Sequence, residues 1–389
     1  MVVHSYYDED PRVRREAESL VAAGFAVDVF ALRRSGDEIA SDVAGVRVRR
    51  LGVQRHQGAG IGVYLQEYLS FLARSSLVLT RAHAKRHYGL VQVHSLPDFL
   101  AFAALPLRLV GVPLVLDLHE AMPEFFRSRF PRASNPIVHR LLLVQERLSI
   151  AIASAVITVN EPMALRLVGL GVRPSKVHIV VNRPSLEQFD QARYPVRPFA
   201  DDGTVRLIYA GALTPTYELD VVMEAIGLIH RERQDLPVRL DVYGRGDSEA
   251  ALRAQAGRLG IGDRVEFHGR IPIEAMPAAI AGSDIGLAPT RRDRFTDVSL
   301  STKVFEYAAM AKPVVATRLP LVEQTFPTGT IRTYEAGEPA SLAVAILAVL
   351  DDPGGREASV AATLAIVQEA SWAHEATAYV ALVESLALR

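Results

Sequence analysis

Two α/β domains, each built around a doubly wound parallel sheet, are the fold that this sequence predicts. Short apolar runs rich in β-branched residues alternate with segments of helical period, which is typical of βαβ units. Most of these runs are continuously apolar, as expected of parallel strands that helices cover on both faces. A length of 389 residues is suited to two such domains.

The strand candidates fall into two sets along the chain. The first set consists of residues 2–5, 26–32, 45–50, 90–95, 113–119, 155–159 and 177–181. The second set consists of residues 205–211, 238–244, 264–269, 284–289 and 313–317. Between the sets, residues 190–204 contain prolines and a glycine and have no apolar period, which predicts a domain boundary. We therefore expect an N-terminal domain over 1–189, a C-terminal domain over 190–371, and a helix over 372–389 that packs back on the N-terminal domain.

Composition excludes several classes of function. The net charge of −1 disfavours nucleic acid as a partner. The absence of cysteine excludes disulfides, thiolate metal sites and a cysteine nucleophile. Prolines or charged residues interrupt the most apolar windows, 100–116 and 141–159, so we expect neither to span a membrane. Met1 runs directly into "VVHS" without a signal peptide, which predicts a cytoplasmic protein.

The segment "STKVFEYAAMAKPVVAT" (301–317) predicts a short helix followed by a buried strand. Lys303 lies in the first helical turn, where the macrodipole disfavours a cation. The free N–H groups of a helix start bind anions, and a phosphate there would make Lys303 its partner. Glu306 would then be placed to bind a vicinal diol such as a ribose. The alternative, slightly favoured by spacing alone, is an ordinary surface pair between Lys303 and Glu306.

The carboxyl end of another strand carries "DLHE" (117–120). His119 is a candidate general acid/base or hydroxyl-binding residue, and the alternative is a histidine satisfied by a neighbouring backbone group. The nearby carboxylates Asp117, Glu120 and Glu124 favour a functional role.

Two glycine turns also follow strands, in "AGALTPTYE" (210–218) and "YGRG" (243–246). They permit close approach of the backbone to a ligand, although a plain tight turn is the commoner explanation. After the first strand, Arg12 is a candidate anion ligand. The triplet "DED" (8–10) resembles a metal-binding motif, but an acidic first turn of a helix explains it more simply.

The segment 68–89 predicts a basic amphipathic helix. Such a helix either contacts an anionic membrane surface from the cytoplasmic side or presents an ordinary solvated face, which is the more common case.

Taken together, these segments resemble the retaining GT-B glycosyltransferases of family 4, also called group 1. The resemblance covers nearly the whole chain. It includes residues 10–32, "LVLDLHEAMPE" (114–124), "HIVVNRP" (178–184) and the half that contains "LDVYGRGD" (240–247). The most specific match is "STKVFEYAAMAKPVVAT", which is similar to a "K-fEYmA-GkPVVA" signature of sugar transferases in surface polysaccharide synthesis. The resemblance implies a GT-B fold, with two Rossmann-like domains facing a cleft.

The resemblance also implies roles for single residues. Glu306 would hold the ribose, Lys303 would assist in diphosphate binding, and His119 would contact the donor sugar or lie near the acceptor hydroxyl. Residues 264–270 would line the base pocket. The expected donor-binding residues are Gly211, Arg245, Arg270, Asp297, Ser299, Leu300, Ser301 and Thr302. Arg12 and Glu120 are expected on the acceptor and phosphate side, and no metal is expected, so protein cations must stabilise the leaving diphosphate.

This chain departs from the family pattern at three places. The acidic residue expected eight positions before Glu306 is replaced by Val298, with Asp297 beside it. The usual diphosphate-binding Arg and Lys correspond to Ala212 and Tyr217, which places more weight on Lys303, Arg245 and Arg12. The loop after the short first strand lacks the usual glycines, which suggests that Met1 is a late start.

The predicted function is transfer of a sugar from a nucleotide-sugar, most simply a UDP- or GDP-sugar, to a hydroxyl acceptor with retained configuration. The acceptor would be a sugar, a glycolipid or a polysaccharide intermediate. One alternative is a nucleotide-sugar epimerase of the same fold, which would need acid/base carboxylates in the cleft and no acceptor. The other is a non-catalytic two-domain protein, which would bind free sugar without nucleotide.

Overall fold

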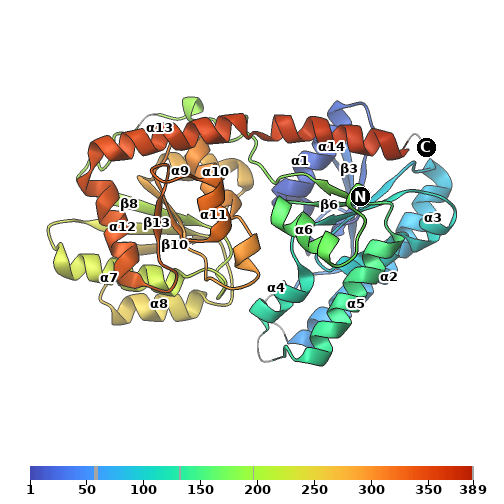
Figure 1. Cartoon of the computed structure of the whole chain (residues 1–389), viewed down its shortest axis with the longest axis horizontal. Coiled ribbons are helices and arrows are strands. Elements are labelled where there is room, and N and C mark those ends of the chain that lie inside the picture. Colours follow the sequence, from blue (N-terminus) through green and yellow to red (C-terminus); the bar gives the residue numbers. More distant parts are fainter. Residues whose placement is uncertain (57–59, 131–132, 196, 388–389) are drawn as a thin grey trace. The chain divides into compact units, whose positions relative to one another are not determined.

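The computed structural model describes residues 1–56, 60–130, 133–195 and 197–387. The chain divides into two compact units (Figure 1). Unit 1 comprises Met1–Asn182 together with Ala373–Arg389, and unit 2 comprises Arg183–Trp372. The predicted boundary segment 190–204 therefore lies within unit 2, and its residue 196 is outside the described residues.

Unit 1 contains two groups of strands. A parallel group has the order β4-β5-β6-β7, with β4 Val91–His94, β5 Leu114–Leu118, β6 Ala155–Thr158 and β7 Val177–Ile179. The second group has the order β1-β3-β2, with β1 Asp28–Leu32, β2 Ala40–Val43 and β3 Val46–Leu51. The antiparallel strand β2 was not predicted, because its alternately exposed residues give no apolar run.

The predicted first strand, 2–5, is reduced to a bridge at Val2, which pairs in parallel with Phe30 of β1 and with Val93 of β4. Val2 therefore links the two groups of strands, and the segment after it lies beside the end of β4. Ligands of open α/β sheets bind where the strand order reverses, so this end of the sheet is a candidate site.

The helices of unit 1 begin with recognisable signals. Asp10, Asn135 and Asn160 accept hydrogen bonds from helix N–H groups, and a proline occupies the first turn after each of them. The α-helices are α1 Pro11–Ala22, α2 Ile61–Arg86, α3 Leu105–Leu109, α4 Met122–Arg129, α5 Pro136–Ile152, α6 Glu161–Gly169 and all but the first residue of α14 Trp372–Ala387. The 3₁₀ turns are η1 Tyr7–Glu9, η2 Asp98–Ala104 and η3 Pro174–Lys176.

Unit 2 contains one parallel sheet of order β10-β9-β8-β11-β12-β13. Its strands are β8 Val205–Ala210, β9 Val238–Tyr243, β10 Val265–Gly269, β11 Ile285–Ala288, β12 Val314–Thr317 and β13 Arg332–Tyr334. The edge strand β13 was not predicted. The strand order reverses between β8 and β11, so the loops after these two strands border the crevice where ligands bind in such sheets.

Helices cover both faces of the unit 2 sheet (Figure 1). Leu207 and Tyr209 of β8 pack in a core with α7 and α12, whereas Ile208 packs in a separate core with α9 and α10. This alternation confirms the doubly wound arrangement. The α-helices are α7 Leu219–Glu232, α8 Glu249–Arg258, α9 Met276–Ala281, α10 Thr302–Ala309, α11 Pro320–Thr325, α12 Pro339–Asp351 and α13 Pro353–Glu369. The 3₁₀ turns are η4 Gln191–Arg193, η5 Gly262–Arg264, η6 Ile273–Ala275 and η7 Thr296–Val298. In the described part of the chain, no helix has both the length and the hydrophobicity to cross a membrane.

Candidate active site

Helix α10 is fixed against the point where the strand order of unit 2 reverses. The hydroxyl of Tyr307 accepts a hydrogen bond from the N–H of Ala210, the last residue of β8 (2.9 Å). The Tyr307 ring lies on Gly286 of β11, where an added Cβ would come within 2.3 Å of the ring. Phe305 and Tyr307 therefore anchor the helix in the core, and Lys303 at its start is held beside Gly211.

Lys303 is buried rather than solvated, since only 5% of its surface is exposed. Its Nζ donates to Ser301 Oγ at 3.0 Å, and burial lowers its pKa to about 8 although Glu306 acts in the opposite direction. The structure therefore argues against the alternative of an ordinary surface pair between Lys303 and Glu306.

Two tyrosine rings accommodate the buried ammonium group. Lys303 Nζ lies 4.1 Å from the ring centroid of Tyr217 and 5.1 Å from that of Tyr209. The faces of aromatic rings attract cations, so these tyrosines stabilise a charge that burial disfavours. Sequence reasoning missed this role, although Tyr217 was recognised as replacing a family lysine.

The glycine turns of unit 2 pack backbone against backbone. An added Cβ at Gly244 would lie 1.8 Å from the carbonyl oxygen of Gly211, and one at Gly246 would lie 2.1 Å from that of Leu213. The close contact with the neighbouring loop therefore requires glycine at positions 244 and 246. This agrees with the interpretation of "YGRG" as a plain structural turn. A Cβ at Gly211 would lie 2.9 Å from the Tyr209 hydroxyl and 3.3 Å from Lys303 Nζ, so this glycine faces side chains that surround the ammonium group.

The other predicted donor-binding residues differ in their burial and in their distance along the sheet from Lys303. Ser299, Leu300, Ser301 and Thr302 are half-buried in the segment that leads into α10, and Glu306 is half-buried within it. Asp297 in η7 is already engaged, since its Oδ1 lies 3.2 Å from Arg292 Nε. Arg245 and Arg270 are exposed and follow β9 and β10, the next two strands along this edge of the sheet.

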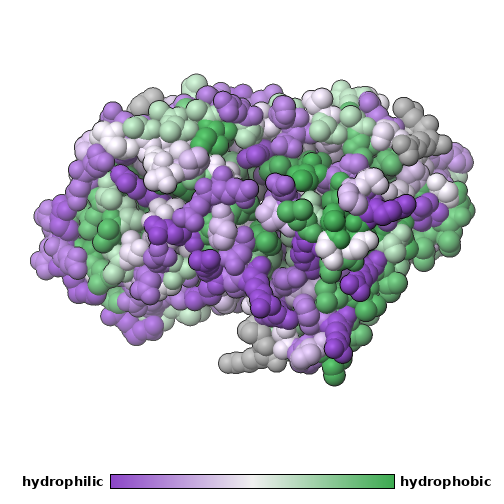
Figure 2. Space-filling model, in the orientation of Figure 1, coloured by the Kyte–Doolittle hydropathy of each residue, from purple (hydrophilic) through white to green (hydrophobic). Residues whose placement is uncertain are grey.

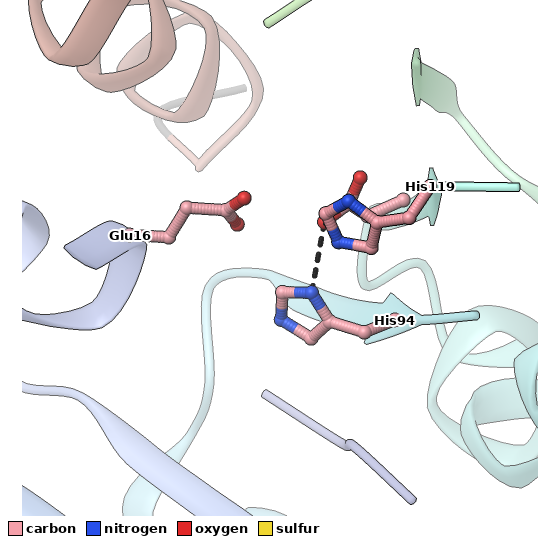
Figure 3. A group of neighbouring side chains, drawn as sticks. Glu16, His94 and His119 are labelled. Carbon is pink, nitrogen blue, oxygen red and sulfur yellow. Dashed lines mark hydrogen bonds and ion pairs between the residues drawn. The ribbon is translucent and has the colours of Figure 1, made fainter. Parts of the chain in front are cut away.

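A second cluster of polar side chains lies in unit 1, at the ends of β4 and β5. Asp117 Oδ2 lies 2.8 Å from His94 Nδ1 and 2.8 Å from His119 Nε2. The two imidazole rings are parallel within 4°, with centroids 6.0 Å apart. Figure 3 shows the carboxyl group of Glu16, from α1, pointing toward the same place. We call Glu16, His94, Asp117 and His119 the histidine cluster.

Charge in the histidine cluster is carried by Asp117. Burial alone would raise the pKa of Asp117, but His119 and His94 together hold it below its ordinary value. Burial lowers the pKa of His119 despite the opposing effect of Asp117. At neutral pH the pair is therefore a carboxylate beside a neutral imidazole. The Nδ1 atom of His119 is buried and has no hydrogen-bond partner among the described residues, so its hydrogen-bonding capacity is unused in this structure.

Arg12 and Glu120 lie close to the histidine cluster. Arg12 Nε donates to Asp10 Oδ1 at 3.1 Å and its Nη2 donates to Asp10 Oδ2 at 3.2 Å, while 30% of the side chain is exposed. Burial raises the pKa of Glu120, and Arg12 opposes that shift.

The "DED" triplet does not form a joint carboxylate site. Asp8 pairs with Arg50 and Glu9 with Arg34, while Asp10 binds Arg12 and accepts from the N–H of Val13 in α1. Each carboxylate thus has an arginine partner, which accounts for the triplet without a metal.

Comparison with known proteins matches both units. The glycosyl transferase 4-like domain matches residues 10–183, and the glycosyl transferases group 1 domain matches residues 204–352. A D-inositol 3-phosphate glycosyltransferase of Pseudarthrobacter chlorophenolicus is 22% identical over 94% of this chain and 87% of its own length. A phosphatidyl-myo-inositol mannosyltransferase of Mycobacterium leprae is 31% identical, over 39% of this chain and 38% of its own length.

Solved structures share the fold over the whole chain. Sucrose-phosphate synthase from Thermosynechococcus elongatus has a TM-score of 0.77 at 18% identity, with 99% of this chain and 98% of that chain covered. Anabaena HepE in complex with UDP and glucose has a TM-score of 0.69 at 16% identity, with the same coverage. The fold is therefore GT-B, as the sequence predicted.

Proposed function

Because the chain belongs to the group 1 glycosyltransferases, we propose that it transfers a sugar from a nucleoside diphosphate sugar to a hydroxyl acceptor with retained anomeric configuration. The observation that carries this proposal is the placement of Lys303. A buried cation beside a glycine, at a helix start where strand order reverses, is suited to a diphosphate.

In this proposal, Lys303 and the N–H groups at the start of α10 bind the diphosphate. Negative charge develops on the diphosphate as the glycosidic bond breaks, and a fixed cation in a water-poor site stabilises that charge. Gly211 leaves room beside Nζ, and Ser299, Leu300, Ser301 and Thr302 supply polar groups ahead of the helix. Arg245 adds a second positive charge from the loop after β9, and no metal is required.

Glu306 is proposed to bind the ribose hydroxyls, and residues 264–270, with Arg270, to line the base pocket. Two neighbours in fold are described with such ligands, HepE in complex with UDP and glucose and a trehalose-6-phosphate structure from E. coli bound with UDP-2-fluoro glucose. These neighbours make UDP the first nucleoside diphosphate to test, with GDP second. Asp297 stands beside the position of the missing acidic residue, and its release from Arg292 would let it bind the sugar.

His119, Arg12 and Glu120 are proposed to bind the reacting sugars from unit 1. His119 Nδ1 accepts a hydrogen bond from a sugar hydroxyl, because Nε2 is directed at Asp117. The relatives are named for inositol phosphate, phosphatidylinositol and 2-deoxystreptamine, which are polyhydroxylated six-membered rings. A cyclitol or its phosphate is therefore the first acceptor class to test, beside sugars and polysaccharide intermediates.

The first test is thermal unfolding in the presence of UDP, GDP, ADP, TDP and CDP, with and without magnesium. A ligand that binds only the folded state stabilises it by about 2.7 kcal/mol at one hundred times its Kd. We expect one nucleoside diphosphate to raise the Tm without magnesium, and Glu306→Ala to weaken that shift while leaving the Tm of the free protein unchanged. A shift with free sugar alone would instead support the non-catalytic alternative.

Turnover assays then separate transfer from epimerisation. Release of nucleoside diphosphate that requires an acceptor supports transfer, whereas conversion of the nucleotide-sugar into its epimer without an acceptor supports the epimerase. The anomeric configuration of the product, measured by proton NMR, tests retention.

We further propose that unit 1 contacts an anionic lipid surface through α2 and α5. The predicted basic helix 68–89 lies in α2 up to Arg86, where that helix ends, and its exposed apolar residues include Leu69 and Leu77 (50% and 51% exposed). Helix α5 adds an exposed stripe at Ile137, Leu141, Val144 and Leu148, each more than half exposed. Figure 2 shows hydrophobic side chains gathered over this part of unit 1.

The charges on these two helices match a negative surface. Arg140 and Arg147 are exposed on the same face of α5 as the apolar stripe, and Arg81, Lys85 and Arg86 are exposed at the end of α2. The acidic residues of both helices, Glu67 and Glu146, are buried and paired with His4 and Arg166. An apolar face with only basic charges at its surface is typical of peripheral membrane helices.

Vesicle sedimentation tests this contact. We expect the protein to sediment with vesicles that contain phosphatidylglycerol, to sediment poorly with pure phosphatidylcholine, and to lose binding in a Leu141→Glu/Leu148→Glu variant. Val344→Glu is the matched control, because Val344 is an equally exposed apolar residue (66%) in unit 2. The proposal would be contradicted if the wild type sedimented equally with both kinds of vesicle. It would also be contradicted if the Leu141→Glu/Leu148→Glu variant sedimented as well as the Val344→Glu control.

A further inference from the structure

A buried chain of hydrogen bonds leads from the C-terminal helix to the histidine cluster. The Tyr379 hydroxyl of α14 donates to Gln92 Oε1 of β4 at 2.6 Å, and Gln92 Nε2 donates to Glu16 Oε2 of α1 at 2.5 Å. All three side chains are at least 96% buried. Neither the fold nor the proposed sugar contacts require this polar chain, because apolar side chains would fill the same space without needing partners.

Glu16 continues the chain to Asp117. A carboxyl oxygen of Glu16 lies within 4.8 Å of one of Asp117, and burial, followed by the charge of Asp117, raises the pKa of Glu16 well above its ordinary value. Two carboxylates cannot both be ionised in a buried site, so one of them keeps a proton. Asp117 is the ionised member because His94 and His119 face it, and Glu16 is therefore the neutral member that donates.

The distances favour a proton-linked network over a metal centre. Glu16, His94, Asp117 and His119 each place one ligand atom within 4.8 Å of the others. However, Asp117 Oδ2 is 2.8 Å from both imidazole nitrogens, which is a hydrogen-bond distance. Two ligands about 2.0–2.2 Å from a tetrahedral zinc lie more than about 3 Å apart.

We propose that Glu16 and Tyr379 are positioning residues that hold Asp117 and, through it, His119 in the state that binds a sugar hydroxyl. Glu16 supplies Asp117 with a neutral donor, so that Asp117 orients His119 without drawing a proton onto it. Tyr379 and Gln92 hold the Glu16 carboxyl group in place, which makes the C-terminal helix a part of the site. This inference rests on the proposed function of His119.

The proposal can be tested by changing Glu16 in two ways. Glu16→Ala deprives Asp117 of its neutral donor, so Asp117 stabilises the imidazolium form more strongly and the pKa of His119 rises. Glu16→Gln keeps an N–H donor toward Asp117 and an acceptor toward Gln92. The other charged or titratable groups near Glu16 are Arg12, Tyr379, Asp117, His94 and His119, and they are unchanged in both variants.

We expect the acid limb of the kcat/KM profile to move up by on the order of one pH unit in Glu16→Ala. Glu16→Gln should restore the wild-type profile, and Tyr379→Phe, which removes one oxygen atom, should shift it in the same direction by less. Proton–carbon NMR of the His119 Cε1 group, assigned with a His119→Gln variant, should show the same order of pKa values. Nucleoside diphosphate affinity should stay unchanged, because Lys303 lies in the other unit.

A merely structural role predicts a different outcome. In that case Glu16→Ala and Glu16→Gln would lower the Tm with no change in the pKa of His119 or in the acid limb, which would overturn the inference. The NMR titration needs no substrate. If no transfer reaction is found but His119 titrates as expected, the proposed function fails while the network stands.

Discussion

Replacing Lys303 with methionine is expected to lower kcat/KM by about 10²- to 10³-fold, the loss typical when one fixed group that faces a developing negative charge is removed. The same change is expected to stabilise the free protein. Burial lowers the pKa of Lys303 to about 8 from 10.5, so at neutral pH its charge costs the fold about 3 kcal/mol relative to the unfolded chain. Methionine has a similar length and carries no charge that must be buried.

The pH dependence of wild type has opposite signs for stability and for binding. Between pH 8 and 10.5 the unfolded chain keeps the Lys303 proton and the folded chain has lost it, so stability rises with pH. Over the same range the folded protein loses the ammonium group, so diphosphate affinity falls. Chemical unfolding and nucleotide titration at several pH values measure both, and Lys303→Met should abolish both dependences.

Lys312→Met is a matched control for this prediction. Lys312 is also partly buried with a lowered pKa, but its Nζ donates to the carbonyl oxygen of Ala281, away from Gly211. This variant should change stability and leave nucleotide affinity as it is. If Lys303→Met lost stability and kept its turnover, Lys303 would be a structural residue and the diphosphate site would lie elsewhere.

Lys303 also illustrates what the sequence could predict. Its place in the first helical turn follows from the helical pattern and the N-cap residues, so the conflict with the macrodipole was visible without a structure. Its burial was not, because it depends on Tyr209 and Tyr217, which come from the end of β8 and the loop after it. Tertiary contacts of this kind leave no periodic signal.

The fold was predictable where strands are buried and was missed where they are not. Continuous apolar runs such as 113–119 predicted the central parallel strands, whereas β2 alternates and β13 is short. Of the histidine cluster, Asp117 and His119 were singled out from the sequence, whereas His94 and Glu16 were not. "DLHE" showed His119 at a strand end, and His94 at the end of "LVQVHS" gave the same signal. Glu16 and Tyr379 lie on helices that are distant from Asp117 in the sequence, and only the fold brings them close to it.

Asp117→Asn is expected to lower kcat/KM by up to about 10⁴-fold, the loss known when the carboxylate that orients a functional histidine is replaced by an amide. Asparagine offers one acceptor oxygen to three donors, and its amide group directs N–H at partners that also donate. Each buried donor left without a partner costs about 1–3 kcal/mol, so stability should fall as well.

Asp117→Asn is expected to lower both kcat/KM and stability. Glu16→Gln is a useful comparison, because it should raise stability instead. The pKa of Glu16 is raised above 4.5 in the fold, so the folded chain keeps a proton that the unfolded chain loses, and stability falls as pH rises through that range. Glutamine removes this dependence and should make the protein more stable at neutral pH than wild type. The pKa of Asp117 is lowered, so its stabilising effect is present above 3.8 and is lost as pH falls below it. Unfolding curves across pH 3 to 8 for the two variants therefore show which carboxyl group, Glu16 or Asp117, carries the negative charge. If both variants were equally destabilised, Glu16 would be ionised, and Asp117 rather than Glu16 would hold the proton.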